Sequence, residues 1–281
     1  MFKMSIGAHS RGARQEVGGF QPKLKLKISF EDKNFIEEKE KKGKENRRKE
    51  HFTVGDFSII KVLGEGAFAK VLMVRQRDTG KLYAMKVIHK SKIMKLVDEE
   101  NPGLTNEELA YRNLYRVKQI ISERNIFSQL NEDPNPFIVQ LHSAFHSKNY
   151  VYFVLDLCPC GDLFNMIQKH RNFNTKQAKL LIAEVILAIQ HLHKHNILYR
   201  DMKPENILID IDGNLKLTDF GLSKQDFTED CEAQTVCGSP EYFCPEILQD
   251  TPYDRTIDFY CLGVLLYELI TGLPPYYNND Q

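Results

Sequence analysis

The strongest constraint on the fold is a change of hydrophobic pattern midway along the chain. After Asp56 come FSIIKVL, KVLMVRQ and LYAMKVI, three apolar and β-branched segments separated by polar or Gly-rich turns, and these predict an antiparallel meander. IVQLHSAF and YVYFVLDL predict two more strands, after which the apolar spacing becomes helical. A strand-rich half followed by a helix-rich half indicates an α+β protein of two lobes, hinged at CPCG.

Three helices are indicated by caps and apolar spacing. Thr105 and Glu108 fit a capping box before a first helix, whose apolar positions are Val117, Ile120, Ile121, Ile126 and Phe127. Thr175 is the expected cap of a second helix, whose apolar positions are Ala178, Leu181, Ile182, Val185, Ile186, Ile189 and Leu192. The run from Phe259 to Ile270 contains Glu268 and is too short for a transmembrane span, so it predicts a buried helix.

Composition excludes several classes of protein. The 281 residues include 38 Lys+Arg and 38 Asp+Glu, so the zero net charge favours neither nucleic acid nor an acidic membrane surface. Six irregularly spaced cysteines indicate reduced thiols, and the lone CxC of Cys158 and Cys160 lacks the second ligand pair of a zinc site. The first residues lack the apolar core of a signal peptide. We therefore expect a cytoplasmic protein without a transmembrane segment, with the nucleus as an additional location.

Residues 1–52 differ in composition from the rest of the chain. Their charged run EEKEKKGKENRRKEH has no apolar face and predicts a disordered or solvated helical tail. A docking or targeting role for its basic half, KKGKENRRK, is the alternative. The expected divisions are this tail, a first lobe over 56–157 and a second lobe over 158–281.

LGEGAFAKV is a candidate phosphate-binding loop between two predicted strands. Gly64 and Gly66 would let backbone N–H groups approach phosphate oxygens without a Cβ clash. A plain hairpin is the alternative, and Ala69 stands where a third glycine would complete the motif. A dinucleotide-binding loop would open a helix, whereas this loop opens a strand.

Charged residues at the expected cleft complete a catalytic set. Lys86, among apolar neighbours on a strand, can pair with nucleotide phosphates if Glu123 holds it. In ILYRDMKPENILI, Asp201 can accept a hydroxyl proton and Lys203 can neutralise phosphoryl charge. Two residues, Asn206 of this segment and Asp219 of LKLTDFGLSK, offer oxygens to Mg²⁺.

Together these motifs resemble the protein kinase superfamily, in its order, from about Asp56 to the C-terminus. The resemblance implies a bilobal fold with a small antiparallel sheet, a mainly helical second lobe, and ATP with Mg²⁺ in the cleft. KPEN after Asp201 is similar to the serine/threonine class. Tyr199, TVCGSPEYFCPE and YDRTIDFYCLGVLLYELITGLPPYY are similar to the AGC group, in its protein kinase A, protein kinase B and serum/glucocorticoid kinase branch.

The resemblance implies roles for many residues of the cleft. The expected ATP contacts are Leu63, Gly64, Glu65, Gly66, Ala67, Phe68, Ala69, Lys70, Val71, Ala84, Lys86, Leu155, Asp156, Cys158, Asp162 and Leu208. Val71, Ala84 and Leu208 should sandwich the adenine ring. Leu155 should be the gatekeeper, and the backbone of Asp156–Cys158 should bind the adenine edge. The hydrophobic spine implied between the lobes is Phe127, Leu141, Tyr199 and Phe220.

The same resemblance implies regulation and substrate preference. Thr235 matches the activation-loop phosphorylation site, served by an upstream kinase, and its phosphate would pair with Arg200. Ser239 should contact the substrate and Asp201, and Asp258 should anchor the catalytic loop. The acids matching positions that bind basic residues before the phosphoacceptor are Asp162, Glu205 and Glu268. Protein substrates with Arg upstream of Ser or Thr are therefore expected.

Two features depart from the family pattern. A surplus segment, about 97–115, separates Lys86 from Glu123 and predicts a surface insert, either neutral or a docking element. Relatives continue beyond PPYYNNDQ, and a later Arg pairs with the residue matching Glu246. Glu246 would lack that buried partner, which should be destabilising, so we expect a fragment, with a truncated protein that folds poorly as the alternative. A pseudokinase or scaffold is the alternative function. A small-molecule kinase is disfavoured by TVCGSPEY.

Overall fold

The computed structural model describes residues 52–66, 69–93, 105–171 and 173–277. The predictions for the charged tail up to residue 51, for Ala67 and Phe68, and for residues 97–104 of the insert lie outside this part of the chain.

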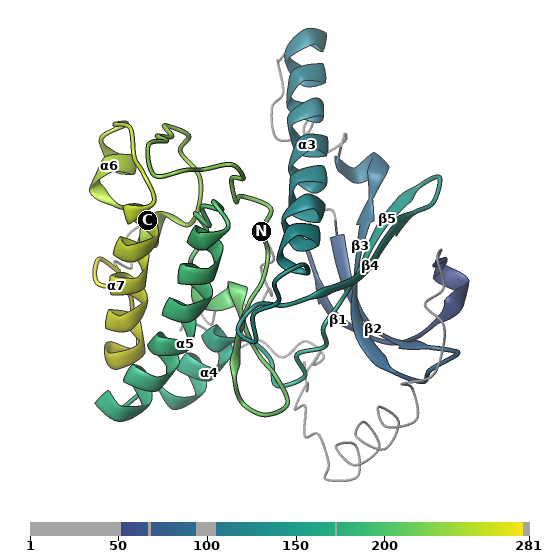
Figure 1. Ribbon diagram of the computed structural model, residues 1–281, viewed down its shortest axis with the longest axis horizontal. Coiled ribbons are helices and arrows are strands. Elements are labelled where there is room, and N and C mark those ends of the chain that lie inside the picture. The colour runs from purple at the N-terminus through teal and green to yellow at the C-terminus, as the bar shows by residue number, and fades with distance from the viewer. Residues whose placement is uncertain (1–51, 67–68, 94–104, 172, 278–281) are drawn as a thin grey trace, which may run out of the picture.

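The described part contains a five-stranded antiparallel sheet in order β1-β2-β3-β5-β4. Its strands are β1 (Phe57–Glu65), β2 (Ala69–Gln76), β3 (Leu82–His89), β4 (Leu141–His146) and β5 (Tyr150–Leu155). The first three form the predicted meander, and β5 lies between β3 and β4 (Figure 1). Residues 138 and 139, predicted as strand, instead pair with Leu217 in the helical half of the molecule.

Alternation along β3 assigns its side chains to two different faces. Ala84 and Ile88 belong to the main core together with Phe127 of the helix α3 (Asn106–Leu130), whereas Tyr83 and Met85 belong to a separate cluster on the other face. Since side chains alternate along a strand, Lys86 shares the face of Ala84 and Ile88. The strand pattern therefore directs this lysine towards α3.

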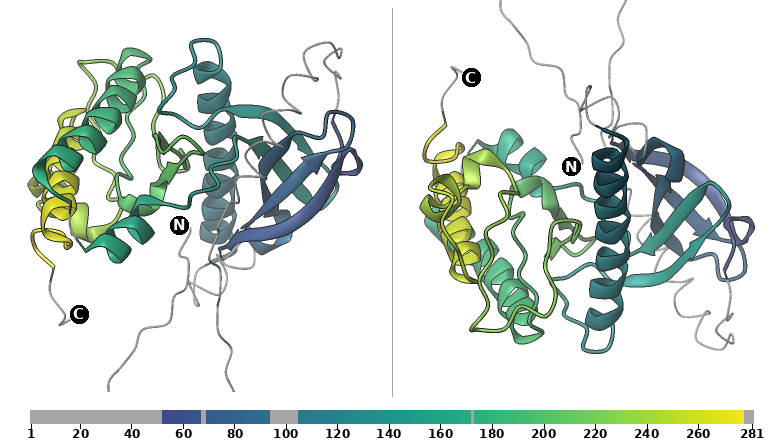
Figure 2. Two further views of the ribbon diagram at one scale, coloured as in Figure 1. Left: turned by 90° about the horizontal axis from the view of Figure 1, so that it is seen from below. Right: turned by 90° about the horizontal axis from the view of Figure 1, so that it is seen from above.

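The helical half follows the sheet, which confirms the α+β class. Its elements are α4 (Leu163–His170), α5 (Thr175–Lys194), α6 (Pro245–Leu248), α7 (Thr256–Thr271) and the hairpin β6 (Ile207–Ile209) with β7 (Leu215–Leu217). Single 3₁₀ turns are η1 (Val54–Asp56), η2 (Pro204–Asn206) and η3 (Pro240–Tyr242). The long helix α3 (Asn106–Leu130) runs between the sheet and the other helices (Figure 2).

The caps of α3 and α5 show one correct prediction and one error. At α3 the Thr105 hydroxyl accepts from the Glu108 N–H at 3.3 Å, and the Glu108 carboxylate accepts from the Thr105 N–H at 2.8 Å. This confirms the capping box and makes residues 106–115 of the predicted insert helical. At α5 the cap is Asn174, which accepts from Gln177 N–H, and Thr175 is already helical.

Burial of α3 and α7 is less complete than their apolar residues predict. Ile126 and Phe127 are buried, but Val117 and Ile121 are exposed. The N-terminal part of α3 projects beyond the sheet (Figure 1). On α7, Leu265 and Leu269 are buried, whereas Phe259 and Ile270, at the ends of the predicted buried run, are exposed. No helix in the described ranges is long and apolar enough to span a bilayer.

Candidate active site

Lys86 of β3, Glu123 of α3 and Asp219 meet where the sheet faces the helical half. Nζ of Lys86 lies 2.6 Å from Oε1 of Glu123 and 3.4 Å from Oδ1 of Asp219. Burial disfavours the charge on Lys86, but the Asp219 and Glu123 carboxylates outweigh it and raise the pKa of Lys86. Burial also opposes ionisation of Asp219, yet Lys86 lowers the pKa of Asp219 below its ordinary value. The ammonium group and the Asp219 carboxylate are thus both charged at neutral pH.

A second buried cluster surrounds Asp201 in the loop before β6. Nζ of Lys203 lies 3.0 Å from both carboxylate oxygens of Asp201 and donates to Oγ of Ser239 at 3.2 Å. Nδ2 of Asn206 donates to the backbone and the side chain of Asp201, so its Oδ1 is the atom that a metal would use. The geometry therefore brings the predicted base, its lysine and the predicted substrate contact together.

Asp258, at the start of α7, fixes the backbone of this loop. Its carboxylate accepts from the N–H groups of Tyr199 and Arg200, each at 3.0 Å, and from Nε2 of His193 at 2.8 Å. Arg200 has a φ of 68°, in the left-handed region that a side chain disfavours. Three hydrogen bonds to one buried acid hold this conformation, and with it the position of Asp201.

The four residues of the expected hydrophobic spine lie in the main core. Phe127 and Phe220 contact edge to face, with ring centroids 4.9 Å apart, and Tyr199 meets Phe220 at 5.9 Å. The Tyr199 hydroxyl donates to the carbonyl of Thr218 at 2.6 Å, next to Asp219. This packing joins α3, the catalytic loop and the Asp219 segment.

The residues expected to contact adenine come from both halves of the molecule. Ala84 of β3 is paired with Leu155 of β5, and Val71 of β2 is paired with Lys86. The expected apolar contacts that belong to the main core or pack against it are Leu63, Ala69, Val71, Ala84, Leu155, Cys158 and Leu208. Apolar side chains of this kind suit a planar ring.

The Gly-rich segment joins two paired strands, as both the phosphate-loop and the hairpin interpretation require. Gly64 pairs with Val71 and Glu65 pairs with Lys70. Lys70 and Glu65 also form an exposed ion pair at 2.9 Å. No Cβ clash is found at Gly64, so the loop leaves open space above it.

At the expected hinge, the Asp156 side chain has a structural role that the sequence does not reveal. It accepts from Nε2 of His142 at 2.7 Å and from the Gln140 N–H at 3.2 Å, and Nζ of Lys216 lies 3.4 Å away. Burial opposes ionisation, but these partners, His142 foremost, lower the pKa of Asp156. Only the backbone of this residue remains as a candidate for ligand contact.

Tyr253 connects Thr235 to Arg200, a link that sequence reasoning missed. Its hydroxyl donates to the carbonyl of Thr235 at 2.7 Å and accepts from the Arg200 guanidinium at 3.3 Å. The Thr235 side chain is exposed. No local pattern identifies Tyr253, because its function depends on a contact between distant segments.

The three acids expected to bind basic residues are also brought near one another. Burial raises the pKa of Glu205, and the nearby charge of Asp162 adds to the effect. Burial also raises the pKa of Glu268 to about 7, with Glu205 and Glu241 contributing. Asp162 differs from the other two, since both its oxygens accept hydrogen bonds from Asn165 and it caps α4.

Two further residues change or extend the sequence-based interpretation. Glu246 lies exposed on α6, so the lack of an Arg partner, which we expected to be destabilising, leaves no buried charge at this position. The sequence analysis also missed Tyr242, whose hydroxyl donates to the carboxylate of Glu268.

Comparison with known proteins identifies the class that this geometry suggests. The sequence-family model of the protein kinase domain matches residues 57–281. The chain is 42% identical over 229 residues to serine/threonine-protein kinase sgk-1 of Caenorhabditis elegans, covering 82% of this chain and 45% of that protein. Human serine/threonine-protein kinase Sgk1 is 42% identical over 230 residues, covering 82% and 49%.

A third relative is the RAC family serine/threonine-protein kinase homolog of Dictyostelium discoideum, 40% identical over 239 residues, which covers 85% of this chain and 49% of that protein. The chain belongs to the protein kinase family, and its resemblance to the branch of Sgk1 and RAC kinases is confirmed. It spans about half the length of these curated relatives.

Proposed function

We propose that this chain transfers the γ-phosphoryl group of ATP to Ser or Thr hydroxyls of proteins. The observation that carries the proposal is the buried contact of Lys203 with both Asp201 oxygens and with Ser239. It places a proton acceptor, a cation and a hydroxyl-bearing contact side by side, which phosphoryl transfer to a hydroxyl requires.

The residues of the cleft fit ATP and Mg²⁺. Oδ1 of Asn206 and the ionised Asp219 carboxylate are oxygen donors, the ligands that Mg²⁺ prefers. When bound, Mg²⁺ would neutralise charge on the phosphates of ATP. Glu123 orients Lys86 towards the same phosphates, and Asp201 accepts the proton of the substrate hydroxyl while Lys203 balances the charge.

Preference for basic substrates rests on the acids Glu205 and Glu268. Buried carboxylates with raised pKa values are destabilised as anions, and a substrate Arg would relieve this by pairing with them. We expect this preference for Arg upstream of the phosphoacceptor, and activation by an upstream kinase at Thr235. The cytoplasmic location stays a prediction.

The test uses the full 281-residue chain, radiolabelled ATP, Mg²⁺ and a pair of peptides with and without Arg upstream of Ser. Phosphorylation of the Arg-bearing peptide should be lost in Asp201→Asn and retained in Asp230→Asn, which changes an exposed acid of the same charge. Activity that survives Asp201→Asn would refute the role of Asp201. Tight binding of Mg²⁺–ATP without any transfer would favour the pseudokinase alternative.

A further inference from the structure

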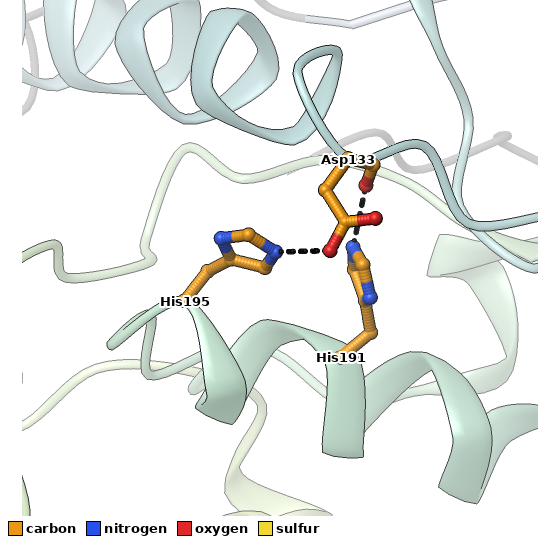
Figure 3. Close-up of side chains that lie close together, drawn as sticks. All are labelled: Asp133, His191 and His195. Carbon is orange, nitrogen blue, oxygen red and sulfur yellow. Dashed lines mark hydrogen bonds and ion pairs between the residues drawn. The ribbon is translucent and has the colours of Figure 1, made fainter.

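Two histidines at the C-terminal end of α5 and an aspartate after α3 form a cluster away from the proposed active site. His191 lies in the last turn of α5 and His195, four residues later, is the C-cap residue of this helix. Figure 3 shows both rings directed at Asp133, which follows α3. Nε2 of His195 lies 3.1 Å from Oδ2 of Asp133, and Nε2 of His191 lies 2.7 Å from the Asp133 carbonyl oxygen.

We propose that Asp133, His191 and His195 bind a divalent transition-metal ion such as Zn²⁺. Two imidazoles and one carboxylate are a common three-ligand set for this ion, with a fourth position for water or a carbonyl. Imidazole ligands do not suit Mg²⁺ or Ca²⁺, which take oxygens. The site is therefore chemically distinct from the proposed Mg²⁺–ATP site and does not depend on kinase activity.

The geometry requires only small side-chain movements. One ligand atom from each of the three residues lies within 4.8 Å of the others. Tetrahedral ligand atoms at Zn–N distances of about 2.0–2.1 Å lie about 3.3 Å apart. Side-chain rotations that move each ligand atom by about 1 Å would therefore bring the three atoms to this separation. All three residues are partly buried, and Gln129 of α3 donates to the backbone carbonyl of His195 at 3.0 Å. This bond already holds the two segments against each other.

One neighbouring cation has to be displaced before a metal ion can bind. Nζ of Lys194 lies 3.0 Å from Oδ2 of Asp133 and competes with a cation for this carboxylate. The Lys194 side chain is mostly exposed, so it can turn to solvent when the metal binds.

The cysteines are a poorer alternative. Burial raises the pKa of Cys158 to about 12, which disfavours the thiolate that zinc requires. Its CxC neighbour Cys160 is exposed, and the described residues contain no further His/Cys/Asp/Glu cluster of metal-binding geometry.

The experiment titrates the full chain with Zn²⁺ alone, without nucleotide, by isothermal titration calorimetry. Wild type should bind a single ion, and His191→Ala and His195→Ala should each weaken binding by at least about tenfold. His170→Ala, an exposed histidine at the end of α4, and Cys160→Ser should leave the affinity unchanged. Lys194→Gln should tighten binding, because the competing cation is removed.

Circular dichroism of each variant separates loss of the site from loss of the fold. Co²⁺ bound to wild type gives an independent measurement, since His and Asp ligands produce no thiolate charge-transfer band. Absence of binding to wild type, full binding to the His191→Ala/His195→Ala double variant, or a thiolate band would each overturn the proposal.

Discussion

Nζ of Lys86 lies 2.6 Å from Oε1 of Glu123, although 37 residues separate the two in the chain. The surplus segment between them does not displace this pair, because its residues 106–115 extend α3 at the end remote from Glu123. The added residues lengthen α3 at its N-terminal end, while its C-terminal turns stay packed on the sheet.

Lys86→Met should destabilise the chain far more than removal of an exposed ion pair. The substitution leaves the buried carboxylates of Glu123 and Asp219 without their cation, so the free energy of unfolding should fall by about 3 kcal/mol. The control is Lys70→Met, which removes the exposed Lys70–Glu65 pair and should cost less than about 1 kcal/mol. Urea unfolding followed by circular dichroism measures both, and equal losses would contradict the argument.

Asp258→Ala should loosen the catalytic loop. It leaves the buried N–H groups of Tyr199 and Arg200 without acceptors, and the free energy of unfolding should fall by at least about 2 kcal/mol. Asp254→Ala, which removes the exposed hydrogen bonds from the N–H and the hydroxyl of Thr256, should cost about 1 kcal/mol. The argument is contradicted if loss of these exposed bonds costs as much as loss of the bonds to Asp258.

Gly238→Ala should be harmful for a steric reason beyond its backbone angle. Gly238 has φ of 106°, and a Cβ there would lie 2.8 Å from the carbonyl oxygen of Arg200. Gly213, with φ of 90° and open space around its Cβ position, is the matched control. Both alanines incur the backbone strain of about 1 kcal/mol, so thermal unfolding should show a larger loss for Gly238→Ala. Equal shifts in Tm would refute the contact.

Glu268 should make stability fall as pH rises towards neutrality. Its pKa is about 7 in the folded chain against an ordinary value of 4.5, so the folded state holds this proton more tightly than the unfolded state does. The contribution of protonated Glu268 to the free energy of unfolding is fully present below pH 4.5 and is lost as pH rises through 7. The slope of this loss is up to about 1.4 kcal/mol per pH unit. Urea unfolding at several pH values between about 5 and 8 should show this decrease in the free energy of unfolding. Glu268→Gln should remove this component, and an unchanged slope would contradict it.

Phosphorylation of Thr235 should order residues 226–239. Arg200 already contacts Tyr253, which binds the Thr235 carbonyl, so a phosphate on Thr235 can reach the guanidinium with little rearrangement. Amide hydrogen exchange in this segment should slow on phosphorylation of wild type and stay unchanged in Arg200→Gln. Slowing of equal size in that variant would show that another cation binds the phosphate.

The sequence by itself determined most of the strands and helices and the residue types of the candidate site. Alternation and β-branched residues predicted five strands close to their observed bounds, since strand patterns are local. The motifs around Asp201 and Asp219 identified an acid–lysine–amide set because the chemistry requires those residue types at short spacing.

Only the tertiary structure decided which side chains are buried and which distant groups meet. Val117 and Ile121 are exposed although the sequence predicted an apolar face there, because burial depends on what packs against a helix. The cap at Asn174, the link through Tyr253 and the cluster around Asp133 arise from backbone geometry and from contacts across the chain. Such contacts follow from the packing of whole elements, which no local pattern encodes.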